Sequence, residues 1–192
     1  MSSANLIEWL AVGFGLAYLL LAMREHIACW AMAFISTSLF LWLFWDAKLM
    51  MESALQVYYL IMAVYGYWQW RSGAAGQERH IQRLTPRQHS LVIIGIAALT
   101  LGSGYWLSHS TEAAQPYLDS FTTWGAVITT YLVAIKILEN WLYWIVIDLA
   151  SMQLYANSEL WVTVGLFGLY VLLAVLGYRT WRQHYLAQNT KS

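Results

Sequence analysis

One carboxylate, Asp148, lies near the middle of a long apolar stretch of this chain. At the centre of a lipid bilayer a charged side chain costs on the order of 2.5–3.5 kcal/mol on insertion scales, unless it faces a cavity or a partner. We therefore expect Asp148 either to act on a ligand, directly or through a neighbour, or to hydrogen-bond another helix. Gln56 and Gln153 are predicted to be buried amides with two similar roles, substrate contact or hydrogen bonding between helices.

Aromatic side chains are the second set that could bind a ligand, because the chain contains 12 Trp and 13 Tyr. In a cavity their rings would stack on a flat heteroaromatic ligand and hold a cation by cation–π attraction of roughly 0.5–2 kcal/mol each. Packing in the core is the alternative. The candidates within apolar stretches are Trp30, Trp42, Tyr59, Trp141 and Trp144. Those at the ends of the stretches are expected to form interfacial belts: Trp9, Trp70, Trp106 and Trp181.

Hydroxyl side chains occur in the middle of two apolar stretches. The first group is Ser36, Thr37 and Ser38, and the second is Thr129 and Thr130. Such hydroxyls could line a polar path or bond to the preceding helical turn. We include Ser38 among the candidate substrate-binding residues.

Other chemistries lack the residues that they need. The chain has no GxxxxGK[ST] phosphate-binding loop, and its 5 His fall in loops or at the ends of apolar stretches, which argues against buried haem or a metal held by paired His. Cys29 is the single cysteine, so no intramolecular disulfide forms. Ser151, one turn from Asp148, is a faint candidate for a nucleophile. We expect no enzyme activity, no metal and no cofactor, and the formal net charge of zero predicts no nucleic-acid partner.

The composition predicts that the chain lies in a lipid bilayer. Hydrophobic residues make up 60% and charged residues 10%, whereas soluble domains are roughly 45–50% apolar and about 25% charged. A transmembrane helix needs roughly 20 apolar residues. Such stretches run approximately over residues 5–23, 27–46, 50–70, 89–108, 118–136, 139–157 and 160–181. We predict an all-α integral membrane protein with about seven transmembrane helices.

The positions of the basic residues predict the orientation, because cytoplasmic loops retain Lys and Arg during insertion. With the N-terminus outside, every one of the 10 Lys and Arg residues except Lys48 falls on the cytoplasmic side. An even number of helices would spoil this bias. The polar segment 71–88 is then a cytoplasmic linker, and the C-terminal tail with Lys191 is cytoplasmic.

Two parts of the chain resemble each other. Five residues of the third apolar stretch recur at the same spacing in the seventh: Tyr59, Gly66, Tyr67, Trp70 and Arg71 recur as Tyr170, Gly177, Tyr178, Trp181 and Arg182. Upstream, the interval between Glu25 and Trp30 matches that between Glu139 and Trp144.

We interpret these matches as a repeat of three helices. Residues 1–71 form the first repeat, residues 72–117 the linker and one inverting helix, and residues 118–192 the second repeat and the tail. This 3+1+3 arrangement gives two parallel repeats. Such a layout is typical of transporters that hold the substrate near the bilayer midplane.

The run from Glu139 to Asp148, with a WxxW core at Trp141 and Trp144, resembles the signature of the PnuC family of bacterial vitamin transporters. Further matches, in the same order, are Cys29-Trp30, Leu55-Gln56-Val57-Tyr58-Tyr59, Tyr65-Gly66-Tyr67-Trp68-Gln69-Trp70 and Asp119-Ser120-Phe121. The resemblance covers nearly the whole chain. It adds Asn140, within the signature run, to the candidate substrate-binding residues.

The resemblance implies a fold similar to SWEET sugar transporters, a place in the bacterial inner membrane, and facilitated diffusion of a dephosphorylated, water-soluble B vitamin. A cytoplasmic kinase then traps the product, since a phosphorylated anion no longer fits. A membrane sensor or a passive channel is the more distant alternative.

Members of this family differ in substrate. Nicotinamide riboside and thiamine are flat heteroaromatic cations, which suit an aromatic cavity with one carboxylate, whereas riboflavin is neutral and bulkier. Relatives that carry nicotinamide riboside tend to show a polar Gln and an Ala-Arg-Lys run near the end of the fifth helix and to accept Asn in place of Asp148. This chain instead has Thr129-Thr130-Tyr131 and Ala134-Ile135-Lys136. We therefore expect thiamine, with nicotinamide riboside as the alternative.

Overall fold

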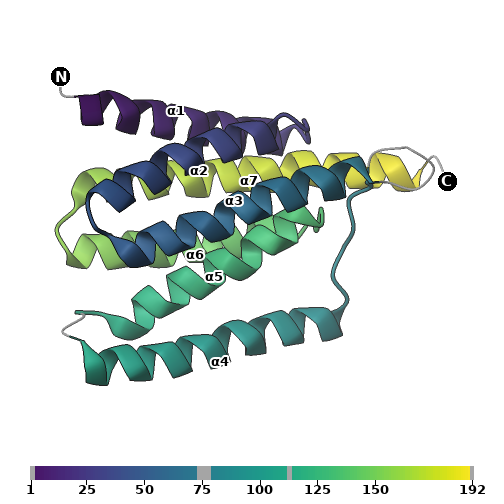
Figure 1. The fold of residues 1–192 in the computed structure, drawn as a ribbon. Helices are drawn as coiled ribbons and strands as arrows, with labels where there is room; N and C mark the ends of the chain where they lie inside the picture. Colours follow the sequence, from purple (N-terminus) through teal and green to yellow (C-terminus); the bar gives the residue numbers. More distant parts are fainter. Residues whose placement is uncertain (1–2, 73–78, 112–113, 191–192) are drawn as a thin grey trace. The chain divides into compact units, whose positions relative to one another are not determined.

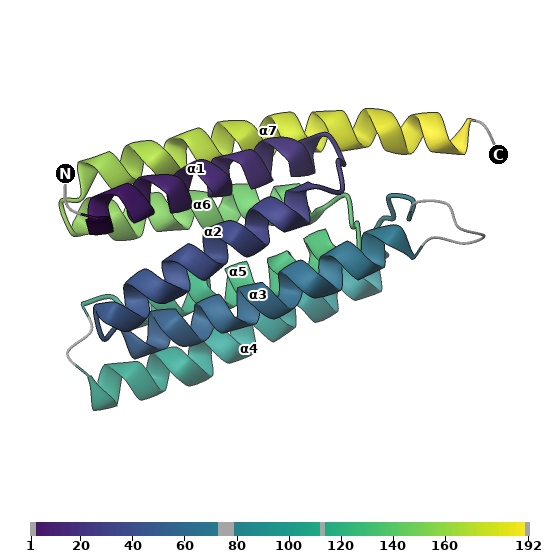
Figure 2. The same cartoon turned by 45° about the horizontal axis from the view of Figure 1, so that its top comes forward.

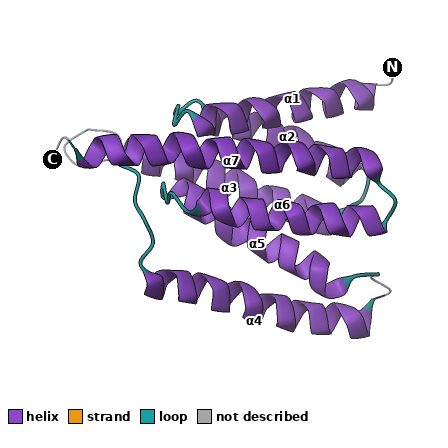
Figure 3. Cartoon of the chain, turned by 180° about the vertical axis from the view of Figure 1, so that it is seen from behind, coloured by secondary structure: helices purple, strands orange, loops and turns teal. Residues whose placement is uncertain are grey.

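The computed structural model describes residues 3–72, 79–111 and 114–190. This part of the chain contains seven α-helices and no strand apart from an isolated bridge between Gln82 and Ile137 (Figures 1 and 3). The helices are α1 (Ser3–Met23), α2 (Cys29–Asp46), α3 (Met50–Arg71), α4 (Pro86–Ser110), α5 (Pro116–Ala134), α6 (Asn140–Asn157) and α7 (Trp161–Asn189). The predicted all-α class is confirmed.

The observed bounds differ from the predicted ones mainly at two helices. α7 continues to Asn189 rather than ending at Trp181, because its polar last turns still have good helix formers. α4 begins inside the predicted linker, where Thr85 accepts a hydrogen bond from the Gln88 amide and Pro86 occupies the first turn, an arrangement that favours helix initiation. Residues 73–78 of the linker and Lys191 lie outside the described residues.

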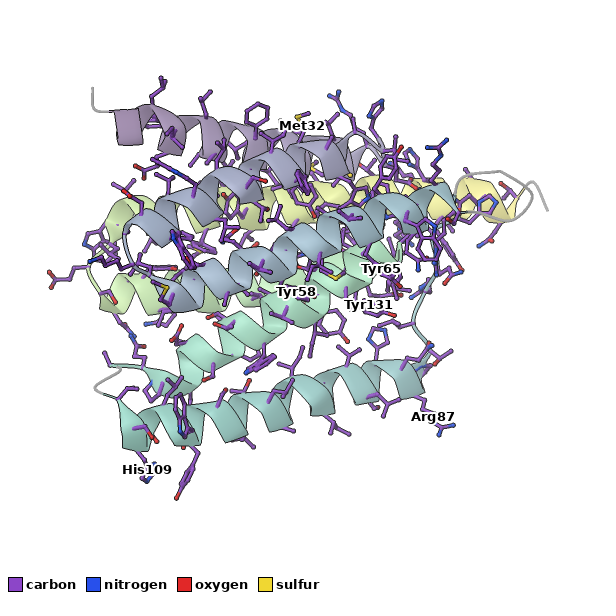
Figure 4. The ribbon with its side chains drawn as sticks, viewed as in Figure 1. Met32, Tyr58, Tyr65, Arg87, His109 and Tyr131 are labelled. Atoms are coloured by element: carbon purple, nitrogen blue, oxygen red, sulfur yellow. The ribbon has the colours of Figure 1, made fainter. Side chains whose placement is uncertain are left out.

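Four of the helices in the described residues are long and apolar enough to cross a membrane: α1, α2, α4 and α7. Helices α3, α5 and α6 are less apolar, because Tyr, Trp and polar side chains take the place of aliphatic ones along them. Figure 4 shows Arg87 and His109 near the two ends of α4, so that its polar residues flank an apolar middle.

The chain divides into two compact units. The first comprises residues 1–80, 134–136 and 186–192, and the second residues 81–133 and 137–185. In the first unit α2 packs against both α1 and α3 (Figure 2). Its buried side includes Trp30 and Ser36, and the Ser36 hydroxyl donates to the Ala11 carbonyl of α1 at 2.7 Å.

The second unit contains α4, α5, α6 and most of α7. α4 contacts α5 where the Trp124 indole donates to the Ser103 hydroxyl at 3.0 Å. α5 approaches α6 closely at Gly125, because a Cβ there would lie 2.9 Å from the Ile147 side chain. This close approach positions the first half of α6.

The two units contain segments with matching backbone geometry. The 111-residue interval that separates Glu25 from Lys136 also separates the first and last residues of α2 from those of α6. Among the described residues it also relates the four non-glycine residues with positive φ: Glu25 (54°) to Lys136 (55°), and Lys48 (60°) to Glu159 (58°).

This interval corrects the alignment expected upstream in the repeat. Trp30 matches Trp141, and Glu25 matches Lys136. The predicted partners, Trp144 and Glu139, each lie three residues further along the chain. The spacing alone does not set the register, because Trp and Glu both recur within one helical turn of Trp141 and Lys136.

Candidate functional site

The buried side of α6 brings together most of the candidate residues of the second unit. Its buried residues are Asn140, Trp141, Ile147, Asp148 and Ser151. At about 100° per residue these positions fall on one side of the helix, and the half-buried Trp144 shares it. The opposite side carries Leu142, Val146 and Leu149, which are exposed as expected for a surface in contact with lipid. The predicted WxxW pair and Asp148 therefore lie on the same inward side of α6.

Asp148 is 5% exposed. Within the residues that the structure describes, no group donates a hydrogen bond to its carboxylate and no cation pairs with it. Tyr170 of α7 lies close enough to interact with it electrostatically. A buried carboxylate without donors carries a large desolvation cost. A cationic ligand would offset that cost.

Tyr170 connects this carboxylate to an aromatic cluster formed by Tyr155, Phe167 and Tyr170. The Tyr155 and Phe167 rings stack with centroids 5.2 Å apart at 24°, and Tyr170 meets Phe167 edge-on at 5.6 Å. The cluster lies on α6 and α7 of the second unit. Rings beside a carboxylate form a suitable surface for a flat cationic heterocycle.

Trp141 is tightly packed in the core and has a structural role. Its ring is 2% exposed and lies edge-on to Trp181, with centroids 5.6 Å apart at 84°. A Cβ on Gly177 would lie 2.7 Å from the same ring. Of the two WxxW rings, Trp144 makes no aromatic contact within the described residues and is the one left available for stacking.

The first unit repeats this packing. Trp30 lies edge-on to Trp70 at 5.4 Å and 86°, and a Cβ on Gly66 would collide with the Trp30 ring. Trp70 and Trp181 are thus buried, and the prediction that they lie in an interfacial belt is wrong. Each of them instead packs against the Trp ring of a Trp–Gly contact. Trp9 and Trp106 are exposed, as expected for belt residues.

Within the described residues, the buried polar atoms of the second unit that have no hydrogen-bond partner include Thr129 Oγ1, Asn140 Oδ1 and Trp141 Nε1. The Asn140 Nδ2 atom is engaged, since it donates to the Ile137 carbonyl at 2.6 Å. Leaving such a group unpaired costs about 1–3 kcal/mol. These atoms offer one donor, one acceptor and one hydroxyl to a polar ligand or to water. The Trp30 indole of the first unit is unpaired in the same way.

Gln153 is exposed and not a buried amide as predicted. It lies five residues after Asp148, on the lipid-facing side of α6, and donates to Asn157 Oδ1 at 2.7 Å. Trp42 is 50% exposed and lies at the corresponding position of α2. The Ser38 hydroxyl donates to the Phe34 carbonyl at 2.7 Å, which is the alternative of a bond to the preceding helical turn. The structure does not bring these three residues onto the sides that carry Trp30 and Trp141.

Gln56 and Tyr59 lie half-buried on α3 of the first unit, on the side that also carries Gly66. The Tyr59 ring packs against Tyr58 with centroids 5.5 Å apart at 60°. Figure 4 labels Tyr58 and Tyr65 on this helix. Gln56 makes no side-chain hydrogen bond within the described residues, so its amide is free to bind a ligand.

Glu139 anchors the start of α6. Its side chain is 3% exposed. Its carboxylate accepts hydrogen bonds from Arg83 Nε at 2.7 Å and from the Leu84 amide at 3.1 Å. The hydrogen bond to Glu139, with the charge of that carboxylate, raises the pKa of the Arg83 guanidinium. The Leu138 amide also donates to the Gln82 carbonyl at 2.8 Å. The segment before α4 thereby fixes the turn that presents Asn140.

Sequence motifs do not single out Tyr170, nor do they show that the Thr129 hydroxyl is unpaired. Tyr170 was visible as the repeat counterpart of Tyr59, a candidate residue. Thr129 was noted for its hydroxyl, but whether that hydroxyl bonded to its own helix depended on geometry: Thr130 donates to Ala126 at 2.7 Å, whereas Thr129 has no partner.

Comparison with known proteins gives a consistent result. The family described as "Nicotinamide mononucleotide transporter" matches residues 5–183. The chain is 27% identical to the nicotinamide riboside transporter PnuC of Neisseria mucosa, over 82% of this chain and 65% of that protein. It is 23% identical to the protein of the same name in Escherichia coli, over 91% and 85%.

Two further similarities extend this picture. The riboflavin/roseoflavin transporter RibM of Streptomyces davaonensis is 23% identical over 87% of this chain and 80% of its own length. The crystal structure of the vitamin B3 transporter PnuC matches with a TM-score of 0.74 at 23% identity, covering 95% of this chain and 83% of that one. The fold is therefore shared with a solved transporter.

Proposed function

Because the chain belongs to the nicotinamide mononucleotide transporter family, we propose that it takes up nicotinamide riboside across the membrane by facilitated diffusion. The observation that carries this proposal is the buried side of α6. There the unpaired Asp148 carboxylate lies on the same side as Trp144 and the unpaired oxygen of Asn140. Nicotinamide riboside matches each feature, with a pyridinium cation for the carboxylate, a flat ring for stacking and sugar hydroxyls for the amide.

Nicotinamide riboside replaces thiamine as the favoured substrate. The expectation of thiamine depended on a shortage of polar groups for a sugar, and the unpaired Thr129 and Asn140 atoms supply them. The relatives described above are named for nicotinamide riboside and riboflavin, not for thiamine. Riboflavin is the second candidate because one relative carries its name, but it would leave Asp148 without a cationic partner.

We place all seven helices across the membrane in the 3+1+3 arrangement, with α4 as the inverting helix. Its support is the shared 111-residue interval of helix bounds, positive-φ turns and Trp–Gly contacts. In this arrangement the N-terminus is periplasmic and the C-terminus cytoplasmic, as the basic residues predict. Asp148 then lies near the bilayer midplane.

Transport by this protein is uniport, with a cytoplasmic kinase as the functional partner that prevents return of the substrate. Phosphorylation would add a doubly charged group that an already acidic site repels. The described residues contain no group of three or more His, Cys, Asp or Glu that could hold a metal ion.

Calorimetry on the purified protein tests the substrate directly. Nicotinamide riboside should bind more tightly than thiamine or riboflavin, and nicotinamide mononucleotide should bind weakest. Tighter binding of thiamine would return it to the position of substrate. Binding of none of these compounds would contradict the transport proposal.

A further inference from the structure

Glu25 and Lys136 form a largely buried ion pair. Lys136 Nζ donates to Glu25 Oε2 at 3.2 Å, and the two side chains are 2% and 12% exposed for Lys136 and Glu25. The ammonium also lies over the Trp70 ring, 4.6 Å from its centroid. The buried cation therefore has both a carboxylate and an aromatic face as partners.

The two residues occupy equivalent turns. Glu25 lies in the turn between α1 and α2, and Lys136 in the turn between α5 and α6, each with φ near 55°. The same hydrogen bond closes both turns, from His26 N to Leu21 O at 2.9 Å and from Ile137 N to Leu132 O at 3.0 Å. A left-handed conformation at a non-glycine residue is uncommon and costs energy. Each turn is held in a geometry that directs its charge at the other.

The pairing has a consequence for the division of the chain. Residues 134–136 group with the first unit, although residues 116–133 before them and 137–157 after them group with the second. The ion pair joins the α1–α2 turn to the turn that follows α5. Movement of one turn away from the other must break it.

We propose that the Glu25–Lys136 pair, with Trp70 beside it, is a latch that holds the α1–α2 turn against the turn before α6 and opens once in each transport cycle. The proposal depends on the transport function above. A buried ion pair suits this role because it has two discrete states, paired and dehydrated or separated and hydrated, with little between.

The chain contains its own reporter of opening. Cys29 is the single cysteine, is 0% exposed, and lies in the first turn of α2, where its amide donates to the His26 carbonyl at 2.9 Å. Its thiol lies within electrostatic range of Lys136. Separation of the latch exposes this thiol, so the rate at which N-ethylmaleimide labels Cys29 measures the open fraction.

Labelling should be measured on the full chain in proteoliposomes. Glu25→Gln removes the charge that holds Lys136, and labelling should become about tenfold faster. The double exchange Glu25→Lys with Lys136→Glu restores an ion pair and should recover most of the protection. Lys48→Gln is the matched control: it also removes one charge at a positive φ, but from an exposed residue in the α2–α3 turn, and should leave the rate unchanged.

Three outcomes would overturn the latch. Labelling of Glu25→Gln at the wild-type rate would show that the pair does not control access. Fast labelling that the double exchange fails to slow, together with a lower melting temperature in both variants, would identify a structural ion pair. An equal effect of Lys48→Gln would indicate general loosening.

The latch and the transport function can fail separately. If nicotinamide riboside neither binds nor crosses the membrane, the proposed substrate is wrong. The labelling pattern of the wild type, Glu25→Gln and the double exchange still reports whether the turns open. A latch that opens in transport also predicts that added substrate changes the wild-type labelling rate, and no change under saturating substrate would contradict it.

Discussion

Gly177 lies directly beneath the indole ring of Trp141, so close that a Cβ at that position would lie 2.7 Å from the ring. Gly66 and Trp30 have the same relationship in the first unit. Small residues allow close approach of helices in membranes, where the hydrophobic effect does not drive helix association. The contact of Gly66 with Trp30 fixes the start of α2 against α3, and the contact of Gly177 with Trp141 fixes the start of α6 against α7.

Substitution of this glycine should destabilise the fold. Gly177→Ala forces the Trp141 ring out of its position, with an expected loss of about 1–3 kcal/mol, typical of overpacking. Gly165→Ala is the matched control in the same helix, because nothing lies within 4 Å of a Cβ there. Thermal unfolding in detergent measures both. Equal stability of the two variants would mean that the Trp–Gly contact does not constrain the helices.

Trp144 should contribute to binding and Trp141 to stability. Trp144→Ala removes a stacking surface and should weaken nicotinamide riboside binding by about 1–3 kcal/mol with little change in melting temperature. Trp141→Ala should lower the melting temperature instead, because it empties the space between Gly177 and Trp181.

The control for this pair is Trp106→Phe, since Trp106 is exposed near the end of α4. It should change neither quantity. Loss of binding and stability together in both Trp144→Ala and Trp141→Ala would show that the two rings have the same structural role.

Removal of the Glu139 carboxylate should loosen the segment before α4. Glu139→Gln loses two charge-assisted hydrogen bonds, from Arg83 and the Leu84 amide, and should cost about 1.5–3 kcal/mol. Glu8→Gln removes an exposed carboxylate in α1 as a control. Hydrogen exchange of residues 82–84 should increase in the first variant alone. Unchanged exchange would show that the backbone contact between Leu138 and Gln82 suffices.

Transport should not depend on an ion gradient. Under the proposed uniport mechanism, the vitamin should only equilibrate across the membrane of proteoliposomes. Ionophores should leave the rate and the final level unchanged. Accumulation driven by a sodium or proton gradient would contradict uniport.

The helices were predictable because membrane insertion imposes long apolar stretches, and the inward place of Asp148 followed from its desolvation cost. It was harder to predict which side of each helix is buried. Gln153 and Gln56 are both amides within apolar stretches. The position of Gln153 relative to Asp148 nevertheless puts it on the exposed side of α6. Helical periodicity from Asp148 would have shown this.

Trp70 and Trp181 illustrate the other limit. Trp at the end of an apolar stretch is usual at a membrane interface, and only the contacts with Trp30 and Trp141 show that these two rings are buried. Tertiary packing decides such cases. The pattern of spacing predicts a repeat, but the positive-φ turns are needed to set its register.

The central claim is that Asp148 binds the cation of the substrate. Asp148→Asn keeps the size and hydrogen-bonding capacity of the side chain but removes the charge. At an effective dielectric constant of about 20 and a separation of about 6 Å, the lost attraction is of order 2–3 kcal/mol, or roughly a 30- to 150-fold change in affinity.

Calorimetry on wild type and Asp148→Asn with nicotinamide riboside and its reduced, uncharged form tests this claim most directly, because the two ligands share the sugar and differ in the ring cation. The cationic ligand should lose roughly 30- to 150-fold in affinity, and the uncharged one should scarcely change. Equal losses for both ligands would show that Asp148 is a structural residue and would contradict the account.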